Sequence, residues 1–181
     1  MKKFLKFILV TILVLLAGIL IAGLVMPNDI TVTRSALVKG TKEDVFEQIV
    51  RFKNWPNWSP FYQMDTAMKL TYTGIDGAAG SAYTWDSKNN DVGSGAMTST
   101  NVKGTRMDYH LEFVRPYKSI ADGYLKVKDS AGMAKATWSF TTHMAFPMNA
   151  LQLFPFMNMD KMVGGDFERG LANLRSVTQN L

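Results

Sequence analysis

The chain of 181 residues is 47% hydrophobic and 19% charged, a balance typical of one folded domain. This excludes a disordered chain and a protein with many membrane spans. Twenty basic and fifteen acidic residues give a net charge of +5, but three positive charges lie at Lys2, Lys3 and Lys6. No basic cluster follows, which excludes a nucleic-acid-binding surface.

The lack of cysteine excludes disulfides, thiolate metal sites and a cysteine nucleophile, and two histidines do not suffice for a multi-histidine site. No His, Ser, Asp or Glu stands in a recognisable catalytic arrangement, and His110 and His143 are expected at the surface. The glycines at 74, 77 and 80 precede a strand and not a helix, so they do not form a phosphate-binding loop. We therefore predict no metal, no cofactor and no catalytic residues.

Residues 7–26 form an uncharged apolar stretch of twenty residues. As a helix it would span about 30 Å, the thickness of the hydrocarbon core of a bilayer. A cleaved signal peptide has a shorter apolar core, so we predict a retained signal-anchor helix. A cleaved signal and a buried helix of a soluble protein are the alternatives.

The cluster of Lys2, Lys3 and Lys6 places the N-terminus in the cytoplasm by the positive-inside rule. We therefore expect a cytoplasmic segment at 1–6, a single span of the cytoplasmic (inner) membrane at 7–26, and a domain at 27–181. The domain would lie outside that membrane, in a periplasmic or extracellular space. Pro27 stops the helix and begins a short linker.

Residues 29–38 alternate β-branched and polar side chains and predict a first strand, although Arg34 interrupts its apolar face. Thr41 and Asp44 are typical of a helix start, and the following helix buries Val45 and Phe46 on one side. Prolines at 56 and 60 exclude a regular helix beyond it.

From Met68 onward, apolar and polar residues alternate over more than seventy residues, which predicts an antiparallel meander with one buried face. A last helix at 159–177 carries Val163, Phe167, Leu171 and Leu174 on one side. We expect it to be the only cover of the apolar sheet face, with Phe167 buried and Arg169 exposed. The order of elements gives an α+β domain with a curved sheet around a helix.

Five segments at plausible spacing add a resemblance to a known superfamily. They are 55–61 (WPNWSPF), 80–87 (GSAYTWDS), 93–95 (GSG), 113–116 (FVRP) and 166–174 (DFERGLANL). Together they resemble the START/Bet v 1-like (SRPBCC) superfamily, in particular its polyketide cyclase/dehydrase and lipid transport group. The resemblance covers about 30–177 and implies a helix-grip fold, but this fold hosts carriers, cyclases, sensors and co-chaperones.

With this resemblance, we interpret the chain as a membrane-anchored, non-catalytic domain that binds a hydrophobic small molecule or lipid in an internal cavity. Inward aromatic and Met side chains are its candidate lining, with plain core packing as the alternative for each. The candidates are Trp55, Trp58, Phe61, Tyr83, Trp85, Tyr109, Trp138, Phe156, Met162 and Phe167.

Two other functions remain open at this stage. One is a cyclase, dehydratase or hydrolase that uses Tyr83 or Tyr109 as an acid/base group, and the other is an interaction module for an envelope protein. The segment 144–162 holds five of the twelve methionines. It is either an ordinary packed connection or a lid over the cavity that touches the nearby membrane. Gly164 and Gly165 in the last helix indicate a close backbone approach or a kink.

Overall fold

The computed structural model describes residues 2–155 and 157–179. Seven antiparallel strands form one sheet in the order β1-β7-β6-β5-β4-β3-β2. The strands are β1 (Asp29–Val38), β2 (Lys69–Thr73), β3 (Ala82–Asp86), β4 (Ser94–Lys103), β5 (Arg106–Arg115), β6 (Ser119–Ser130) and β7 (Met133–His143). The helical elements are α1 (Lys2–Val25), α2 (Lys42–Val50), η1 (Phe52–Asn57), α3 (Pro60–Met64), η2 (Met148–Leu153) and α4 (Met159–Thr178). The predicted α+β helix-grip fold is confirmed.

Local signals set the element boundaries in the first half of the domain. The Thr41 hydroxyl accepts a hydrogen bond from the Asp44 amide at 3.1 Å, so the expected cap of α2 is present. The chain then turns into η1, a short 3₁₀ helix that contains Pro56, and α3 begins at Pro60. In this region Phe52 packs against Tyr83 of β3, and Trp55 and Trp58 pack against Trp138 of β7. All three therefore cover the inner face of the sheet.

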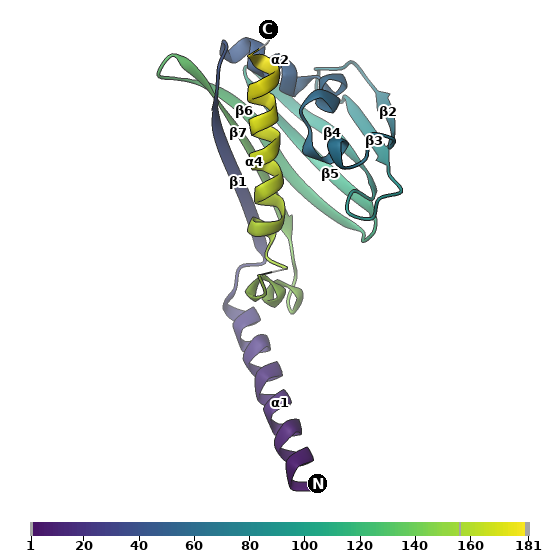
Figure 1. Cartoon of the computed structure of the whole chain (residues 1–181), viewed down its shortest axis with the longest axis vertical. Coiled ribbons are helices and arrows are strands. Elements are labelled where there is room, and N and C mark those ends of the chain that lie inside the picture. Colours follow the sequence, from purple (N-terminus) through teal and green to yellow (C-terminus); the bar gives the residue numbers. More distant parts are fainter. Residues whose placement is uncertain (1, 156, 180–181) are drawn as a thin grey trace.

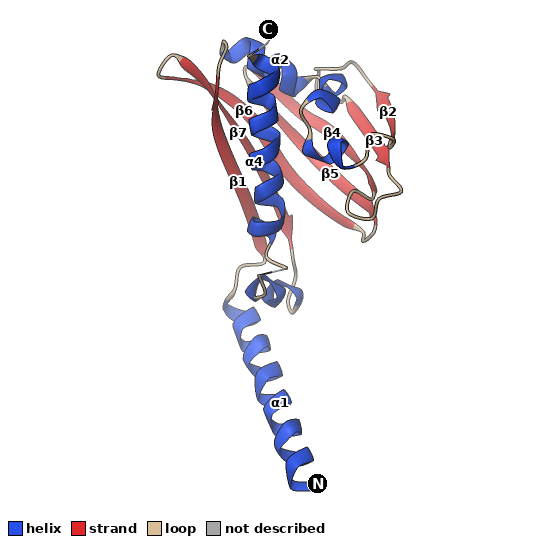
Figure 2. Ribbon diagram, in the orientation of Figure 1, coloured by secondary structure: helices blue, strands red, loops and turns tan. Residues whose placement is uncertain are grey.

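Helix α4 lies along β1 and crosses the sheet on its concave side (Figure 2). Arg34 of β1 reaches it: the guanidinium donates to Asp160 at 2.8 Å and to Glu168 at 2.6 Å. A Cβ on Gly164 would collide with this guanidinium, whereas Gly165 has open space around it. Arg34, which interrupts the apolar face of β1, therefore packs its guanidinium against the backbone of α4 at Gly164. This is the close backbone approach that the glycine predicted.

Two groups of helices, not one, cover the concave face. Phe167 of α4 is buried and Arg169 is exposed, as expected. However, Trp55, Trp58 and Phe61 also lie against Trp138 of β7. The expectation that α4 is the only cover is wrong, because α2 packs on β6 and β7 and η1 and α3 fill the space between α2 and α4.

Helix α1 projects away from the sheet, and the short helix η2 lies between the two (Figure 1). The helix is long and apolar enough to cross a membrane, and nearly all of its side chains are exposed. Its only buried residue is Gly23, near its C-terminal end.

Candidate functional site

Five of the aromatic residues that were predicted to line a cavity form a packed cluster: Trp55, Trp58, Phe61, Trp138 and Phe167. The rings of Trp138 and Phe167 stack with centroids 4.2 Å apart and planes 7° apart. Trp58 lies edge-on to Trp138 at 5.4 Å and contacts Trp55 at 4.9 Å. These distances match direct aromatic contact, which leaves no room for a guest molecule between these rings.

Each indole N–H in this region has a partner within the protein. Trp55 donates to the Ile49 carbonyl at 2.8 Å, and Trp58 donates to the Gln48 carbonyl at 3.0 Å. Trp85 donates to the Val92 carbonyl at 3.1 Å. Tryptophan N–H groups are therefore not available as ligand donors here.

Tyr109 is equally engaged. Its hydroxyl donates to the Ser139 carbonyl at 2.8 Å and accepts from Trp138 Nε1 at 3.1 Å. Burial raises the pKa of Tyr109 well above the ordinary range, and burial does the same to the pKa of Tyr83. Both tyrosines therefore stay neutral at any physiological pH.

Glycines allow the rings to approach the backbone closely. A Cβ on Gly170 of α4 would lie 2.8 Å from Trp138 Cζ3 and 3.0 Å from Pro60 Cδ. A Cβ on Gly123 would collide with the Tyr109 ring. The space beneath α4 is thus closed by direct contact between helix, ring and sheet.

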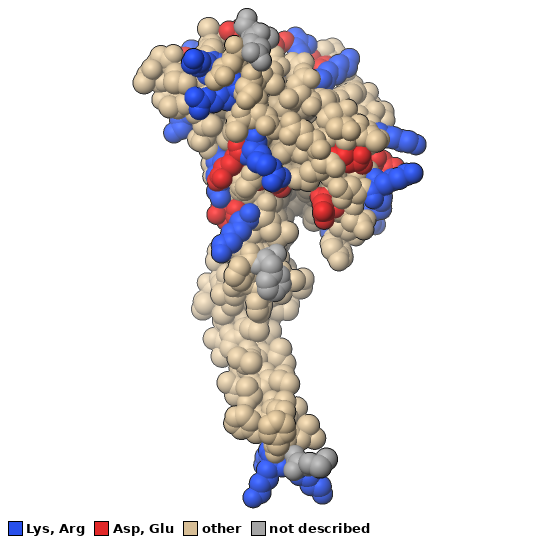
Figure 3. Space-filling view, in the orientation of Figure 1, with Lys and Arg blue, Asp and Glu red and all other residues tan. Residues whose placement is uncertain are grey.

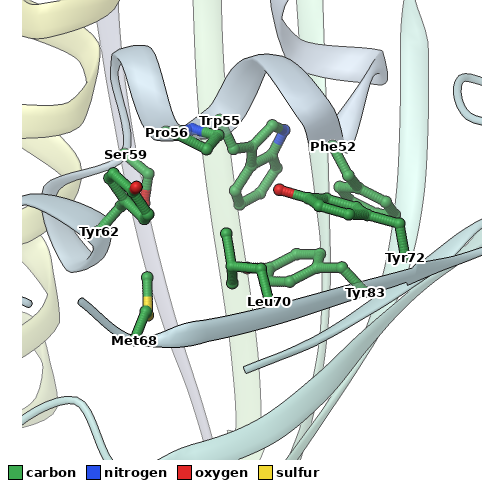
Figure 4. A pocket seen from close by; sticks show the side chains of 9 residues that line it. All are labelled: Phe52, Trp55, Pro56, Ser59, Tyr62, Met68, Leu70, Tyr72 and Tyr83. Carbon is green, nitrogen blue, oxygen red and sulfur yellow. The ribbon is translucent and has the colours of Figure 1, made fainter. Parts of the chain in front are cut away.

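A small pocket remains at the far side of the aromatic cluster, between η1–α3 and the edge strand β2 with its neighbour β3 (Figure 4). Aromatic and apolar side chains dominate its lining, and the rings of Phe52 and Tyr83 pack edge to face with centroids 5.0 Å apart. The pocket encloses about 10 Å³, enough for one water molecule. Its lining residues are Phe52, Trp55, Pro56, Ser59, Tyr62, Met68, Leu70, Tyr72 and Tyr83.

Two of the ten predicted lining residues, Trp55 and Tyr83, border this pocket. Phe61 is partly buried against Trp138, Met162 is exposed on α4, and Phe156 lies outside the described residues. The other five belong to the buried core: Trp58, Trp85, Tyr109, Trp138 and Phe167. Whether any of the ten contacts a ligand stays a prediction.

Leu70 and Tyr72 border the pocket but were not predicted as site residues. The signal was present, because Met68, Leu70 and Tyr72 alternate with polar residues and therefore share one face of β2. What the alternation could not show is that this face borders η1 and not α4. No cluster of His, Asp or Glu within 2–155 and 157–179 is placed to hold a metal ion.

Solved structures with the same arrangement identify the fold class. The di-domain ARO/CYC protein StfQ from the steffimycin biosynthetic pathway superposes with a TM-score of 0.64 at 10% identity, over 84% of this chain and 52% of its own. Ara h 8.0201 superposes with a TM-score of 0.54 at 13% identity, over 82% of this chain and 99% of its own. XoxI from Bacillus cereus gives 0.54 at 21% identity, over 81% and 94%.

These likenesses define a Bet v 1-like helix-grip domain, and at such low identity they show the fold alone. The family follows from the sequence itself. Residues 29–179 match the model of the polyketide cyclase / dehydrase and lipid transport family, and the chain belongs to that family. No curated protein matches the sequence.

Proposed function

We propose that this protein is a membrane-anchored, non-catalytic domain that binds a hydrophobic group at the aromatic pocket between η1–α3 and β2–β3. The observation that carries the proposal is the half-buried part of the pocket lining, where Leu70, Tyr72 and Tyr62 present apolar surface beside Ser59. Pockets for small ligands combine such apolar walls with a few polar groups. Membership of a family described by lipid transport supports the same ligand class.

The pocket must widen to admit an acyl chain or ring. Two of the elements that form its walls, β2 and α3, are short enough to move apart. Strand β2 has five residues and pairs only with β3, and α3 is a helix of five residues. Short elements at a sheet edge open at low free energy compared with central strands. We infer that ligand entry displaces β2 or α3 and leaves α4 in place.

The membrane anchor in this proposal is α1. It is twenty-four residues long, almost completely exposed, and free of charge after Lys6. An exposed apolar helix of this length is costly in water and stable across a bilayer. Lys2, Lys3 and Lys6 favour an orientation with the N-terminus in the cytoplasm and the domain on the other side.

Binding without catalysis is supported by the state of the two candidate acid/base groups. Tyr109 is fully hydrogen-bonded, and burial holds both Tyr83 and Tyr109 neutral. A general acid or base works best with a pKa near the operating pH, and neither group has one.

Photo-crosslinking of the full chain in nanodiscs tests the proposal. A diazirine fatty acid is added, and labelled peptides are mapped by mass spectrometry. We expect label on the peptides that contain 52–72, and loss of that label in Leu70→Trp, which fills the pocket. Thr71→Trp, on the opposite face of β2, is the matched control and should keep the label. Label on α1 alone, or equal pocket label in both variants, would contradict the pocket assignment.

The packed interior also favours a second candidate, a module that presents the convex sheet face to an envelope protein. That face carries the exposed hydroxyls of Thr33 and Ser35, which pair with the buried Ser139 and Thr137 at 2.8 Å and 2.9 Å. Crosslinking in cells from position 31 or 33 would capture a partner on this face, and an absence of crosslinks would exclude it.

A further inference from the structure

The segment between β7 and α4 has an unusual composition and position. From residue 144 to residue 159 it contains no Lys, Arg, Asp or Glu. Its short helix η2 packs against the C-terminal part of α1, away from the aromatic pocket (Figure 1). We call residues 144–155 and 157–158 the collar.

One face of α1 receives the collar. Ile19, Ala22, Gly23 and Met26 follow helical spacing and are buried or half-buried, whereas their neighbours in α1 are exposed. A Cβ on Gly23 would lie 3.2 Å from both Ala150 Cβ and Phe146 Cδ2. Gly18, one and a half turns earlier, has nothing within 4 Å. The helix is therefore shaped for the collar at one level only.

Asn149 fixes that level by hydrogen bonds. It is fully buried, and its amide nitrogen donates to the Gly23 carbonyl at 2.7 Å and the Met26 carbonyl at 3.1 Å. Asn28 Oδ1 lies 3.0 Å from the same nitrogen, so three acceptors share its two hydrogens. The last carbonyls of a helix have no partner within the helix, and leaving them unpaired is costly near a bilayer. Asn149 thus caps α1 from within the collar.

The outer surface of the collar stays apolar. Phe146 is 45% exposed, Met148 55%, Leu153 51% and Met157 40%. Figure 3 shows an uncharged zone that continues from α1 through this level, with the charged side chains of the domain beginning beyond it. Single exposed apolar residues are common, but an uncharged group of them beside an apolar helix indicates an interaction surface.

The length of α1 indicates which part of the bilayer lies level with the apolar surface of the collar. The uncharged run ends at Met26, three residues after Gly23, so Gly23 lies about 4.5 Å inside its end. A run of twenty residues matches the hydrocarbon thickness with almost nothing to spare. Side chains packed at Gly23 therefore lie level with the outer boundary of the hydrocarbon core, where amphipathic segments bury their apolar face about 5–10 Å deep.

We propose that the collar inserts Phe146, Met148 and Leu153 into the boundary between headgroups and acyl chains of the bilayer. This rests on the proposed membrane anchoring by α1. The domain is then held by two contacts, a span and an interfacial segment, and its orientation on the membrane is fixed. In this proposal, lipid and not a protein partner covers the exposed apolar side chains of the collar.

The lack of cysteine allows a direct test in the full chain. Single variants Met148→Cys and Leu153→Cys are labelled with nitrobenzoxadiazole and reconstituted in phosphatidylcholine nanodiscs that contain spin-labelled lipids. Ile75→Cys is the matched control, because Ile75 is an apolar side chain with 79% exposure at the opposite end of the sheet. Leu13→Cys, midway along α1, reports whether the helix spans the bilayer.

We expect strong quenching at 148 and 153 by lipids labelled at the headgroup or high on the acyl chain, and none at 75. Position 13 should be quenched by lipids labelled deep in the acyl chain. Quenching at 13 without quenching at 148 and 153 would overturn the collar proposal while leaving the anchor intact. A blue-shifted but unquenched label at 148 would also overturn it, because a second copy or a protein partner would then cover the surface. Without quenching at 13, the anchor itself fails and the collar proposal falls with it.

Two glycine variants test whether α1 sets the depth of the collar. Gly23→Leu should displace Ala150 and Phe146 and reduce quenching at 153, whereas Gly18→Leu should leave it unchanged. Equal quenching in both variants would overturn the assignment of depth to this contact.

Discussion

The aromatic face of the sheet has two ends that differ in how they are covered. At one end, the twenty-residue helix α4 covers the sheet, and its Phe167 ring stacks directly on Trp138 of β7. Under η1 and α3, Leu70 and Tyr72 remain half-buried beside elements of five or six residues. The same kind of side chain therefore serves as core at one end and, in our proposal, as a binding surface at the other. What decides the role is the length and rigidity of the cover.

The largest effect is expected at the closed end. Phe167→Ala should lower the free energy of unfolding by about 3–5 kcal/mol, because it removes the ring that stacks on Trp138. Arg169→Ala, an exposed neighbour on α4, should change it by less than about 0.5 kcal/mol. Denaturation of the full chain in nanodiscs can be followed by tryptophan fluorescence, since all four tryptophans lie in the domain. Equal losses would mean that α4 does not close this end.

Two glycines of α4 should respond in opposite directions. Gly170→Ala places a methyl group against Trp138 and Pro60 and should cost about 1–3 kcal/mol. Gly165→Ala meets nothing and should stabilise the domain by about 0.5–1 kcal/mol, because glycine is unfavourable in a helix interior. The same denaturation assay measures both, and a stabilising Gly170→Ala would show that the closed end is loosely packed.

The open end should separate binding from stability. Tyr72→Ala removes a half-buried ring and should cost only about 1 kcal/mol. It should nevertheless abolish photo-crosslinking of the diazirine fatty acid at the pocket, because Tyr72 is one of its walls. Thr71→Ala, on the solvent side of β2, should keep the label. A large loss of stability in Tyr72→Ala would place this end in the core.

The smallest effect is electrostatic. Hydrogen bonding to Arg34 lowers the pKa of Asp160 below its usual value. A lowered pKa in the folded state means that the stabilising contribution is present above about pH 4 and fades as the pH falls through the folded value. Asp160→Asn should therefore destabilise by less than about 1 kcal/mol at pH 7, and the difference from wild type should shrink towards pH 3. A difference that is independent of pH would show that the ion pair contributes nothing.

Much of the fold follows from local patterns. The first strand was predicted at 29–38 and is observed there, and Thr41 caps α2 as its spacing with Asp44 predicts. The alternation from Met68 onward predicted a meander but not the ends of its strands. Strands β6 and β7 continue to Ser130 and from Met133, because their polar ends pair with each other although they bury little. The alternation identifies buried positions and does not mark where pairing stops.

The closed interior could not be predicted in this way. Inward alternation correctly placed Trp138 and Tyr109, but whether a cavity remains depends on contacts between elements far apart in the sequence. Because Gly170 and Gly123 have no side chain, the backbone can lie directly against the rings of Trp138 and Tyr109, which leaves no cavity there. Nothing in the local sequence of these glycines indicates that role. Likewise, the collar has a readable composition, but its contact with Gly23 depends on the end of β7 returning to the start of β1.

That return has a consequence for how the molecule is made. Strand β1 is the first to be synthesised, yet β7 is its only partner in the sheet, and Asp29 and His143 are 114 residues apart. Contacts between distant residues form slowly, and unpaired strand edges are prone to aggregate. If α1 inserts into the membrane while the rest of the chain is still being synthesised, β1 has no pairing partner until β7 has been made. The rate at which β7 pairs with β1 would then limit how fast the domain reaches its native state and how long its edge is open to aggregation.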